Sequence, residues 1–230
     1  QFKKGILLSL LTILTGICFI IERKITIDVL GVDKFGLFGL LLFIFGFIRV
    51  AHKNFNLPNT VLNREYLATR NYKKVQQLLF KRFFVLVFLI SPFMIFFGTE
   101  VLSYVLENFL EKYVLLVPIL SIFLLYAINK LLINHFGYIL YAEGIFKLSW
   151  MYTILILEVL ILALGLFFGD FSSLLEIVQF LAILSASKAF VIVFLTQFSL
   201  KVSILKSVFN TLFIVGYPQI IFYAIQATYY

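Results

Sequence analysis

Seven stretches of this sequence are long and apolar enough to be interpreted as membrane-spanning helices. Six of them, at about 5–21, 35–49, 83–98, 113–141, 149–168 and 173–196, reach or approach the roughly 20 apolar residues that cross a bilayer core. The seventh, at about 208–225, is weaker because polar and helix-breaking residues interrupt it. The runs are continuous rather than alternating, which favours helices over barrel strands. We therefore expect an all-α bundle of about seven spans that forms a single transmembrane domain over residues 1–230.

The composition excludes the other broad classes of protein. Hydrophobic residues make up 63% of the chain and charged residues only 13%, whereas a soluble domain is nearer half apolar and a quarter charged. The single cysteine, Cys18, excludes an internal disulfide. The chain begins with Gln1 rather than methionine, from which we expect a fragment of a longer protein, with both natural ends open.

The charged residues divide between the two ends of the expected spans. With the N-terminus on the cytoplasmic side, thirteen of the 19 lysines and arginines fall in cytoplasmic segments and four in outer segments. Eight of the 11 carboxylates fall outside. Because cytoplasmic segments carry an excess of lysine and arginine, this bias predicts a multi-pass protein of the inner (cytoplasmic) membrane with a cytoplasmic N-terminus. It also explains the formal charge of +8 without a nucleic-acid partner.

The only sizeable connection, residues 50–82, is expected to hold a helix at the membrane surface. Asn56, Pro58 and Asn59 are expected to break the chain, and Thr60 is a suitable cap for a helix over 60–80. Basic residues lie among its apolar ones, which suits an anionic membrane interface. The helix is then either a lipid-sensing element or an anchor that positions the third span. Its apolar positions are Val61, Leu62, Tyr66, Tyr72, Val75, Leu78 and Leu79.

The sequence carries no familiar catalytic motif. It has no HExxH helix, nucleophile elbow, phosphate-binding loop or cysteine cluster. His52 and His135 are 83 residues apart and are interpreted as interfacial or hydrogen-bonded residues rather than metal ligands. We therefore expect no enzyme, no metal site and no cofactor.

Three charged residues lie inside the expected spans. A charge near the bilayer centre costs roughly 2.5–3.5 kcal/mol on insertion scales, so it usually faces a partner or a wet cavity. At about 1.5 Å per residue, Lys130, Glu158 and Lys188 lie roughly 16, 15 and 12 Å from the inner ends of their spans. The short connection at 169–172 makes the fifth and sixth spans antiparallel neighbours, so Glu158 and Lys188 are expected to pair.

Two interpretations of these charges stay open. In the first, Glu158 and Lys188 neutralise one another and only set the register of their helices. In the second, two lysines against one carboxylate leave a net positive centre in a water-filled cavity, where an anionic group of a substrate binds. Tyr126, Lys130 and Asn134 form a polar stripe at i, i+4 and i+8 beside this candidate site.

Several short motifs follow one another in a distinctive order. They are Ile21-Glu22-Arg23, Leu30 to Phe38, Leu57-Pro58, the basic segment 64–82, the apolar run 83–98 and Tyr141-Ala142-Glu143-Gly144-Ile145-Phe146-Lys147. Their order resembles the second half of polysaccharide flippases, which belong to the multidrug/oligosaccharidyl-lipid/polysaccharide exporter superfamily. An acidic–basic step followed by a Leu-Gly…Gly-aromatic pattern resembles the junction of the seventh and eighth helices in that family. The resemblance covers roughly residues 5–196.

The resemblance implies a C-terminal lobe, helices seven to thirteen of a 12–14-helix exporter, without the N-terminal lobe. It implies that undecaprenyl-diphosphate-linked oligosaccharide is moved by alternating access from the inner to the outer leaflet for cell-surface polysaccharide or O-antigen synthesis, with H+ or Na+ coupling. Basic residues facing a cavity would meet the diphosphate. The candidates are Lys130, Lys188 and Arg23, with Tyr126 and Asn134 beside them and Glu158 as the ion-coupling site; Arg23 has the alternative of lying among outer lipid headgroups.

Other functions stay open at this point. A small-molecule or drug exporter of the same superfamily would expose net negative charge in its cavity, which the two lysines speak against. A membrane-embedded glycan-assembly enzyme would need a His, Asp or Arg constellation at a membrane face, and the outer segments carry little beyond carboxylates. A non-catalytic assembly subunit would not need charges at the middle of the membrane.

Overall fold

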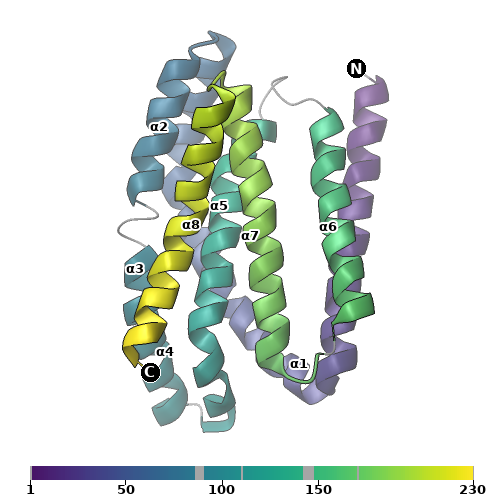
Figure 1. Cartoon of the computed structure of the whole chain (residues 1–230), viewed down its shortest axis with the longest axis vertical. Coiled ribbons are helices and arrows are strands. Elements are labelled where there is room, and N and C mark those ends of the chain that lie inside the picture. The colour runs from purple at the N-terminus through teal and green to yellow at the C-terminus, as the bar shows by residue number, and fades with distance from the viewer. Residues whose placement is uncertain (1, 86–90, 110, 142–147, 170, 230) are drawn as a thin grey trace.

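The computed structural model describes residues 2–85, 91–109, 111–141, 148–169 and 171–229, and Figure 1 shows them as a bundle of helices. The expected all-α fold is confirmed, since these residues contain no strand. A π-helical segment, Met94–Gly98, joins α3 to α4, and a 3-10 segment, Glu111–Ile119, precedes α5. The helices are α1 (Phe2–Ala68), α2 (Tyr72–Phe84), α3 (Ser91–Phe93), α4 (Thr99–Phe109), α5 (Leu120–Tyr141), α6 (Leu148–Phe168), α7 (Leu174–Ser199) and α8 (Ile204–Tyr229).

Among the described residues, three helical segments are long and apolar enough to cross a membrane. They are Leu116–Gly137, Leu174–Ser199 and Ile204–Ala224, which correspond to the fourth, sixth and seventh expected spans. A shorter apolar helix, Ile154–Gly165, lies in the fifth. The third expected span includes residues 86–90, which lie outside the described ones. The count of seven spans therefore stays a prediction.

Helix α1 replaces the connection expected between the first two spans. Residues 22–30, which we expected in an outer segment, continue the helix, and a kink follows at Gly31. The φ of 71° and ψ of 166° at Gly31 belong to a region that is open essentially only to glycine. The chain therefore changes direction within one residue, and the side chains just before the kink are carried on a helix.

The break expected at residues 56–59 is wrong. The backbone is helical from residue 51 through Ala68, past Pro58, because a proline removes only one backbone hydrogen bond and membrane helices tolerate it. The chain turns instead at 69–71, where Arg70 has a positive φ of 56°. Asn71 then caps α2, since its side-chain Oδ1 accepts from the backbone N–H of Lys74 at 3.3 Å.

The apolar side of the predicted surface helix is partly confirmed. Val75 and Leu79 are buried in one cluster with Leu200, and Tyr66 and Tyr72 pack against it. The side chain of Gln76 donates to the carbonyl oxygen of Leu200 at 2.7 Å. Helix α2 is therefore fastened to the end of α7 rather than lying free, whereas Leu62, expected on the same face, is exposed.

Helix α7 is the central element of the bundle (Figure 1). It packs along α5 more extensively than any other pair of helices does, and α8 lies against both. The Asn129 amide donates to the Ala182 carbonyl at 3.4 Å and accepts from Gln219 at 3.1 Å, so it links all three helices. The Gln197 amide donates to the Thr211 hydroxyl at 3.1 Å. Because side-chain amides in apolar surroundings bond across helices, α5, α7 and α8 form one hydrogen-bonded unit.

Helix α6 and the N-terminal part of α1 form a second pair on the other flank of α7 (Figure 1). The connection from α6 to α7 is short, and Ser173 begins α7 with a capping box, in which its hydroxyl accepts from the N–H of Glu176 while the Glu176 carboxylate accepts from the N–H of Ser173. This fixed start sets the register of α7 against α6, which decides which side chains in the middle of the two helices can meet.

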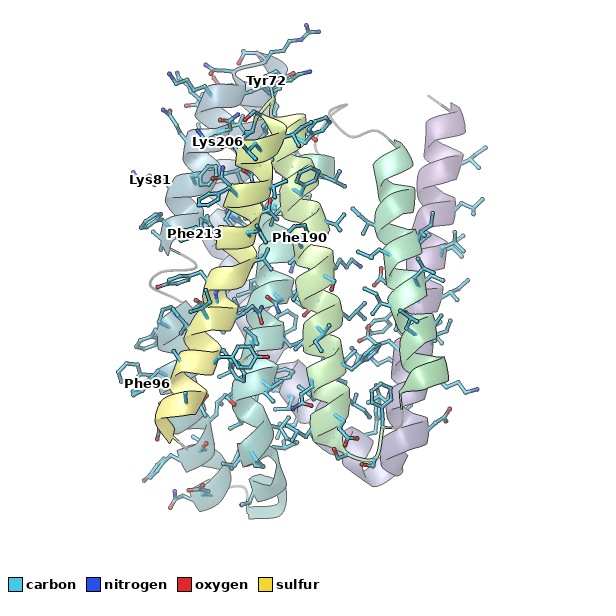
Figure 2. All side chains as sticks on the ribbon, viewed as in Figure 1. Tyr72, Lys81, Phe96, Phe190, Lys206 and Phe213 are labelled. Atoms are coloured by element: carbon cyan, nitrogen blue, oxygen red, sulfur yellow. The ribbon has the colours of Figure 1, made fainter. Side chains whose placement is uncertain are left out.

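Segments that the sequence places on the cytoplasmic side gather at one end of the bundle. The N-terminus, the start of α2 and the α7–α8 turn lie together there, and Figure 2 shows Tyr72 and Lys206 at that end, with Phe96 towards the other. The end of α1, the turn after it, α2, the α7–α8 turn and the start of α8 carry these exposed basic residues: Arg64, Arg70, Lys73, Lys74, Lys81, Lys201 and Lys206. One end of the molecule is therefore strongly basic.

Gly165 lets α6 approach α7 closely, and replacing it with alanine is expected to destabilise the bundle. The added Cβ would meet the Phe180 ring, with two ring carbons at 2.8 and 2.9 Å. That ring packs against Phe171, with centroids 5.2 Å apart, so it has little room to withdraw. Overpacking of this kind costs about 1–3 kcal/mol. Unfolding of Gly165→Ala in denaturing detergent measures this loss of stability. The same change in a Phe180→Leu background should lower the free energy of unfolding by less. An equal loss in both backgrounds would disprove the clash.

Candidate binding site in the middle of the bundle

Glu158 and Lys188 form an ion pair between α6 and α7, as the sequence predicts. The ammonium Nζ of Lys188 lies 2.6 Å from Oε2 of Glu158, and the two side chains are only 17% and 10% exposed. Glu158 lies ten residues into α6, near its midpoint, and Lys188 lies near the midpoint of α7. A charged pair at such depth must satisfy itself internally or meet water, because hydrocarbon cannot solvate it.

Glu22 and Arg23 add a second charged pair, on α1, and lie within a helix rather than in the connection expected between the first two spans. Glu22 is 5% exposed, and its Oε1 lies 3.6 Å from Nη2 of Arg23. The Arg23 guanidinium lies over the rings of Phe19 and Phe38, 4.6 and 5.1 Å from their centroids. Cation–π contacts of this kind hold a guanidinium in place, so Arg23 is a packed side chain of the bundle.

Tyr126 joins the two charged pairs from α5. Its side chain is buried, and its hydroxyl interacts electrostatically with Glu22, Arg23 and Glu158. The ammonium of Lys130, one turn further along α5, lies 5.2 Å from the centroid of the Tyr126 ring. The predicted stripe on α5 is therefore real for its first two members.

Asn134, the third member of the stripe, is exposed. We call the remaining six residues the mid-bundle cluster, since α1, α5, α6 and α7 all contribute to it. Cys18 of α1 is buried beside it and interacts electrostatically with Glu158, Lys188 and Glu22. The cluster consists of Glu22, Arg23, Tyr126, Lys130, Glu158 and Lys188.

The mid-bundle cluster keeps a formal surplus of one positive charge. It holds three cations and two carboxylates, and each carboxylate is paired, Glu158 with Lys188 and Glu22 with Arg23. Within the described ranges Lys130 forms no ion pair, and its side chain is partly exposed. A partly exposed ammonium beside a buried tyrosine is suited to hold one anionic oxygen of a ligand.

Buried polar atoms of the Glu22–Arg23 pair lack hydrogen-bond partners. In the part of the chain that the structure describes, these are Oε1 of Glu22 and both Nε and Nη1 of Arg23. A buried donor or acceptor left unsatisfied costs about 1–3 kcal/mol, more for charged groups. The Glu22–Arg23 pair therefore has hydrogen-bonding capacity left over, and a water molecule or a polar ligand group that reached it would be bound favourably.

Among the described residues, no group of three His, Cys, Asp or Glu side chains is placed to hold a metal ion. His135 is buried on α5 and lies 3.5 Å from the carbonyl oxygen of Leu79, which agrees with its interpretation as a hydrogen-bonded residue.

Comparisons with known proteins do not identify the chain: no protein-family model matches it, and neither does a curated protein or a solved structure. Over its described residues the protein is all-helical, with three helices long and apolar enough to cross a membrane and with a cluster of charged side chains between helices. The resemblance to flippases therefore stays a proposal, and residues 142–147 of its last motif lie outside the described ones.

Proposed function

We propose that this chain is the C-terminal lobe of a flippase that moves lipid-diphosphate-linked oligosaccharide across the membrane, and that it is a transporter rather than an enzyme. The observation that carries the proposal is the positive surplus of the mid-bundle cluster, in which Lys130 pairs with no carboxylate of the described residues while Glu22 and Glu158 are paired. A diphosphate carries several negative charges and needs cations at the depth where it crosses. The order of motifs described above supports the same assignment.

In this proposal, Lys130 makes the first contact with the diphosphate. Lys188 is held by Glu158 at 2.6 Å, so it becomes a second contact only when that carboxylate lets it go. Protonation of Glu158, or binding of Na+ to it, would release Lys188 and so link an ion to the substrate. Arg23 is held by two aromatic rings and positions Tyr126 rather than leaving the bundle to meet substrate.

The movement is proposed to occur between two units of the bundle. Helices α5, α7 and α8 are held together by buried amides, as described above. The α6 helix and the N-terminal part of α1 contact this unit through apolar side chains and the mid-bundle cluster. Alternating access by rocking of one unit against another is a general mode of membrane transport.

We infer that the basic end of the bundle faces the cytoplasm and that the protein lies in the cytoplasmic membrane with its N-terminus inside. Exposed lysines and arginines gather on α2 and on the α7–α8 turn at that end, and cytoplasmic segments are enriched in such residues. Reaction of a Lys206→Cys variant with an impermeant thiol reagent added outside intact cells would contradict this orientation.

The test is transport by the full-length protein that contains this chain, in liposomes loaded with a fluorescent lipid-diphosphate-linked oligosaccharide. Lys130→Gln should lower the initial rate about tenfold or more, because a hydrogen bond to a charged group is worth about 1.5–3 kcal/mol. Lys130→Arg should retain most activity, since it keeps the charge. Lys206→Gln is the matched control, an exposed lysine at the basic end. Equal rates in Lys130→Gln and the control would reject the proposed site.

One observation favours a second candidate function, a non-transporting subunit of a membrane assembly. Both carboxylates of the mid-bundle cluster are already paired, as a static bundle requires. Under this alternative the cluster only fixes helix register. Variants of Lys130 would then leave the stability and assembly of the bundle unchanged and would show no transport defect.

A further inference from the structure

A pocket of about 390 Å³ lies between α1 and the end of α6, and none of the residues that line it belongs to the mid-bundle cluster, although Glu22 and Arg23 are its sequence neighbours on α1. It is lined by Ile21 and Ile25 of α1, by Gly165 and Gly169, and by the Phe171 ring. Lys24 and Asp28 of α1 also line it. Its volume falls in the range of small-ligand sites, roughly 300–1,000 Å³. The pocket therefore combines an apolar interior with one positive and one negative side chain.

The two charges of the pocket have no partner of their own. Lys24 and Asp28 are both exposed, and within the described ranges neither forms an ion pair. They are four residues apart on α1, so their Cβ atoms are about 5–6 Å apart on one face of the helix. Lysine before aspartate is the less favourable order for an i, i+4 pair along a helix. Both charges are therefore available to a ligand.

We propose that this pocket binds a phospholipid with a zwitterionic headgroup that carries a primary ammonium, as in phosphatidylethanolamine. The lipid phosphate would lie at Lys24 and its ammonium at Asp28. The acyl chains would follow the apolar surface of Ile21, Ile25 and Phe171. In such a headgroup only two carbon atoms separate the phosphate ester from the ammonium, which suits two opposite charges one helical turn apart.

The position of the pocket suits a lipid of the membrane. It lies at the end of α6 and close to the kink at Gly31, which is the end of the bundle opposite the N-terminus in Figure 1. Headgroups lie at the ends of membrane-spanning helices, and the acyl chains run alongside them. A side chain at Gly169 would meet Phe171, with the added Cβ 2.5 Å from Cε2 of the ring, so the glycine helps to keep the pocket open.

The experiment is native mass spectrometry of the intact chain in detergent with equal amounts of phosphatidylethanolamine and phosphatidylglycerol. The unmodified chain should retain phosphatidylethanolamine preferentially. Lys24→Gln should lower its retention about fivefold, the size expected for losing one exposed charge contact. Asp28→Asn should abolish the preference over phosphatidylglycerol, which has no ammonium. Lys206→Gln, at the opposite end, is the matched control and should leave both quantities unchanged.

Circular dichroism of each variant reports its helix content and so distinguishes a loss of lipid binding from a loss of folding. Equal retention of the two lipids by the unmodified chain, or no change in Lys24→Gln and Asp28→Asn, would overturn the proposal. Competition by water-soluble glycerophosphoethanolamine at the same concentration would also overturn it, because the apolar interior would then contribute nothing. The side chains tested here, Lys24 and Asp28, are not members of the mid-bundle cluster, so a negative result would leave the proposed transport function standing.

Discussion

Replacing Lys188 with methionine is expected to lower the free energy of unfolding by about 3 kcal/mol or more. The change leaves the Glu158 carboxylate, only 10% exposed, without its partner at 2.6 Å. Removing one member of a buried ion pair typically costs about 3–5 kcal/mol, because the remaining charge stays buried and uncompensated. Reversible unfolding in mixed micelles of a mild detergent and dodecyl sulfate measures the loss.

The matching double variant separates coupling from simple loss of packing. Glu158→Gln combined with Lys188→Met should recover most of the lost stability, since no unpaired charge then remains. Lys206→Met, an exposed lysine changed in the same way, should have almost no effect. If the double variant is as unstable as the sum of the two single variants, the two side chains do not interact in the folded protein.

Replacing Ala189 with leucine is expected to destabilise the bundle by about 1–3 kcal/mol or more. Ala189 is fully buried in α7, in one cluster with Leu132 and Phe136 of α5. Small residues allow two membrane helices to approach closely, and extra methylene groups in a filled interface force side chains and backbone apart. The same unfolding assay measures this cost.

Ala224 provides the control for that substitution. It lies on α8 and is exposed, so Ala224→Leu adds the same atoms without overpacking. We expect a change within about 0.5 kcal/mol at this position. Equal destabilisation by the two variants would mean that α5 and α7 are not packed as the structure has them.

The helices and the Glu158–Lys188 ion pair could be predicted for one physical reason, the cost of leaving a polar or charged group unsatisfied in hydrocarbon. Long apolar runs must form helices where backbone groups have no water to bond, and a charge in such a run needs a partner. Glu158 and Lys188 lie at similar depth on helices joined by a short connection, and their pairing follows from those facts. This is the part of the candidate site that periodicity and charge cost determine.

The position of Glu22 and Arg23 could not be predicted in the same way. Adjacent charges after an apolar run are typical of the end of a span, and nothing local indicates that α1 continues to Gly31. Their burial depends on Phe38, which reaches Arg23 only because α1 kinks and returns. A contact of this kind is set by packing between distant segments, which a single sequence does not display.

The turn at 69–71 has a recognisable cap residue in the sequence, but the proline at position 58 points to an earlier break. Pro58 and its neighbouring asparagines are strong turn residues, so the break was expected there. Asn71, however, is a favourable helix cap, and its side chain bonds the N–H of Lys74 in the structure. Choosing between two plausible breaks requires knowing that α2 packs on Leu200, which is a tertiary contact.

The proposed transport function requires that water reaches the mid-bundle cluster, although the cluster lies between apolar helices. Accessibility of Lys130 tests this most directly, because its ammonium is the surplus charge of the cluster. A Lys130→Cys variant, made with Cys18→Ala, is treated in membrane vesicles with a water-soluble cationic thiol reagent. Val159→Cys is the matched control, since Val159 follows Glu158 on α6 and is an exposed apolar residue.

The predicted result is rapid reaction at position 130 that slows when a lipid diphosphate is added, and no reaction at position 159, which faces lipid. If the cysteine at position 130 reacts as slowly as the one at position 159 when the reagent is added to either side of the membrane, the transport proposal is contradicted. No aqueous path would then lead to the ammonium of Lys130.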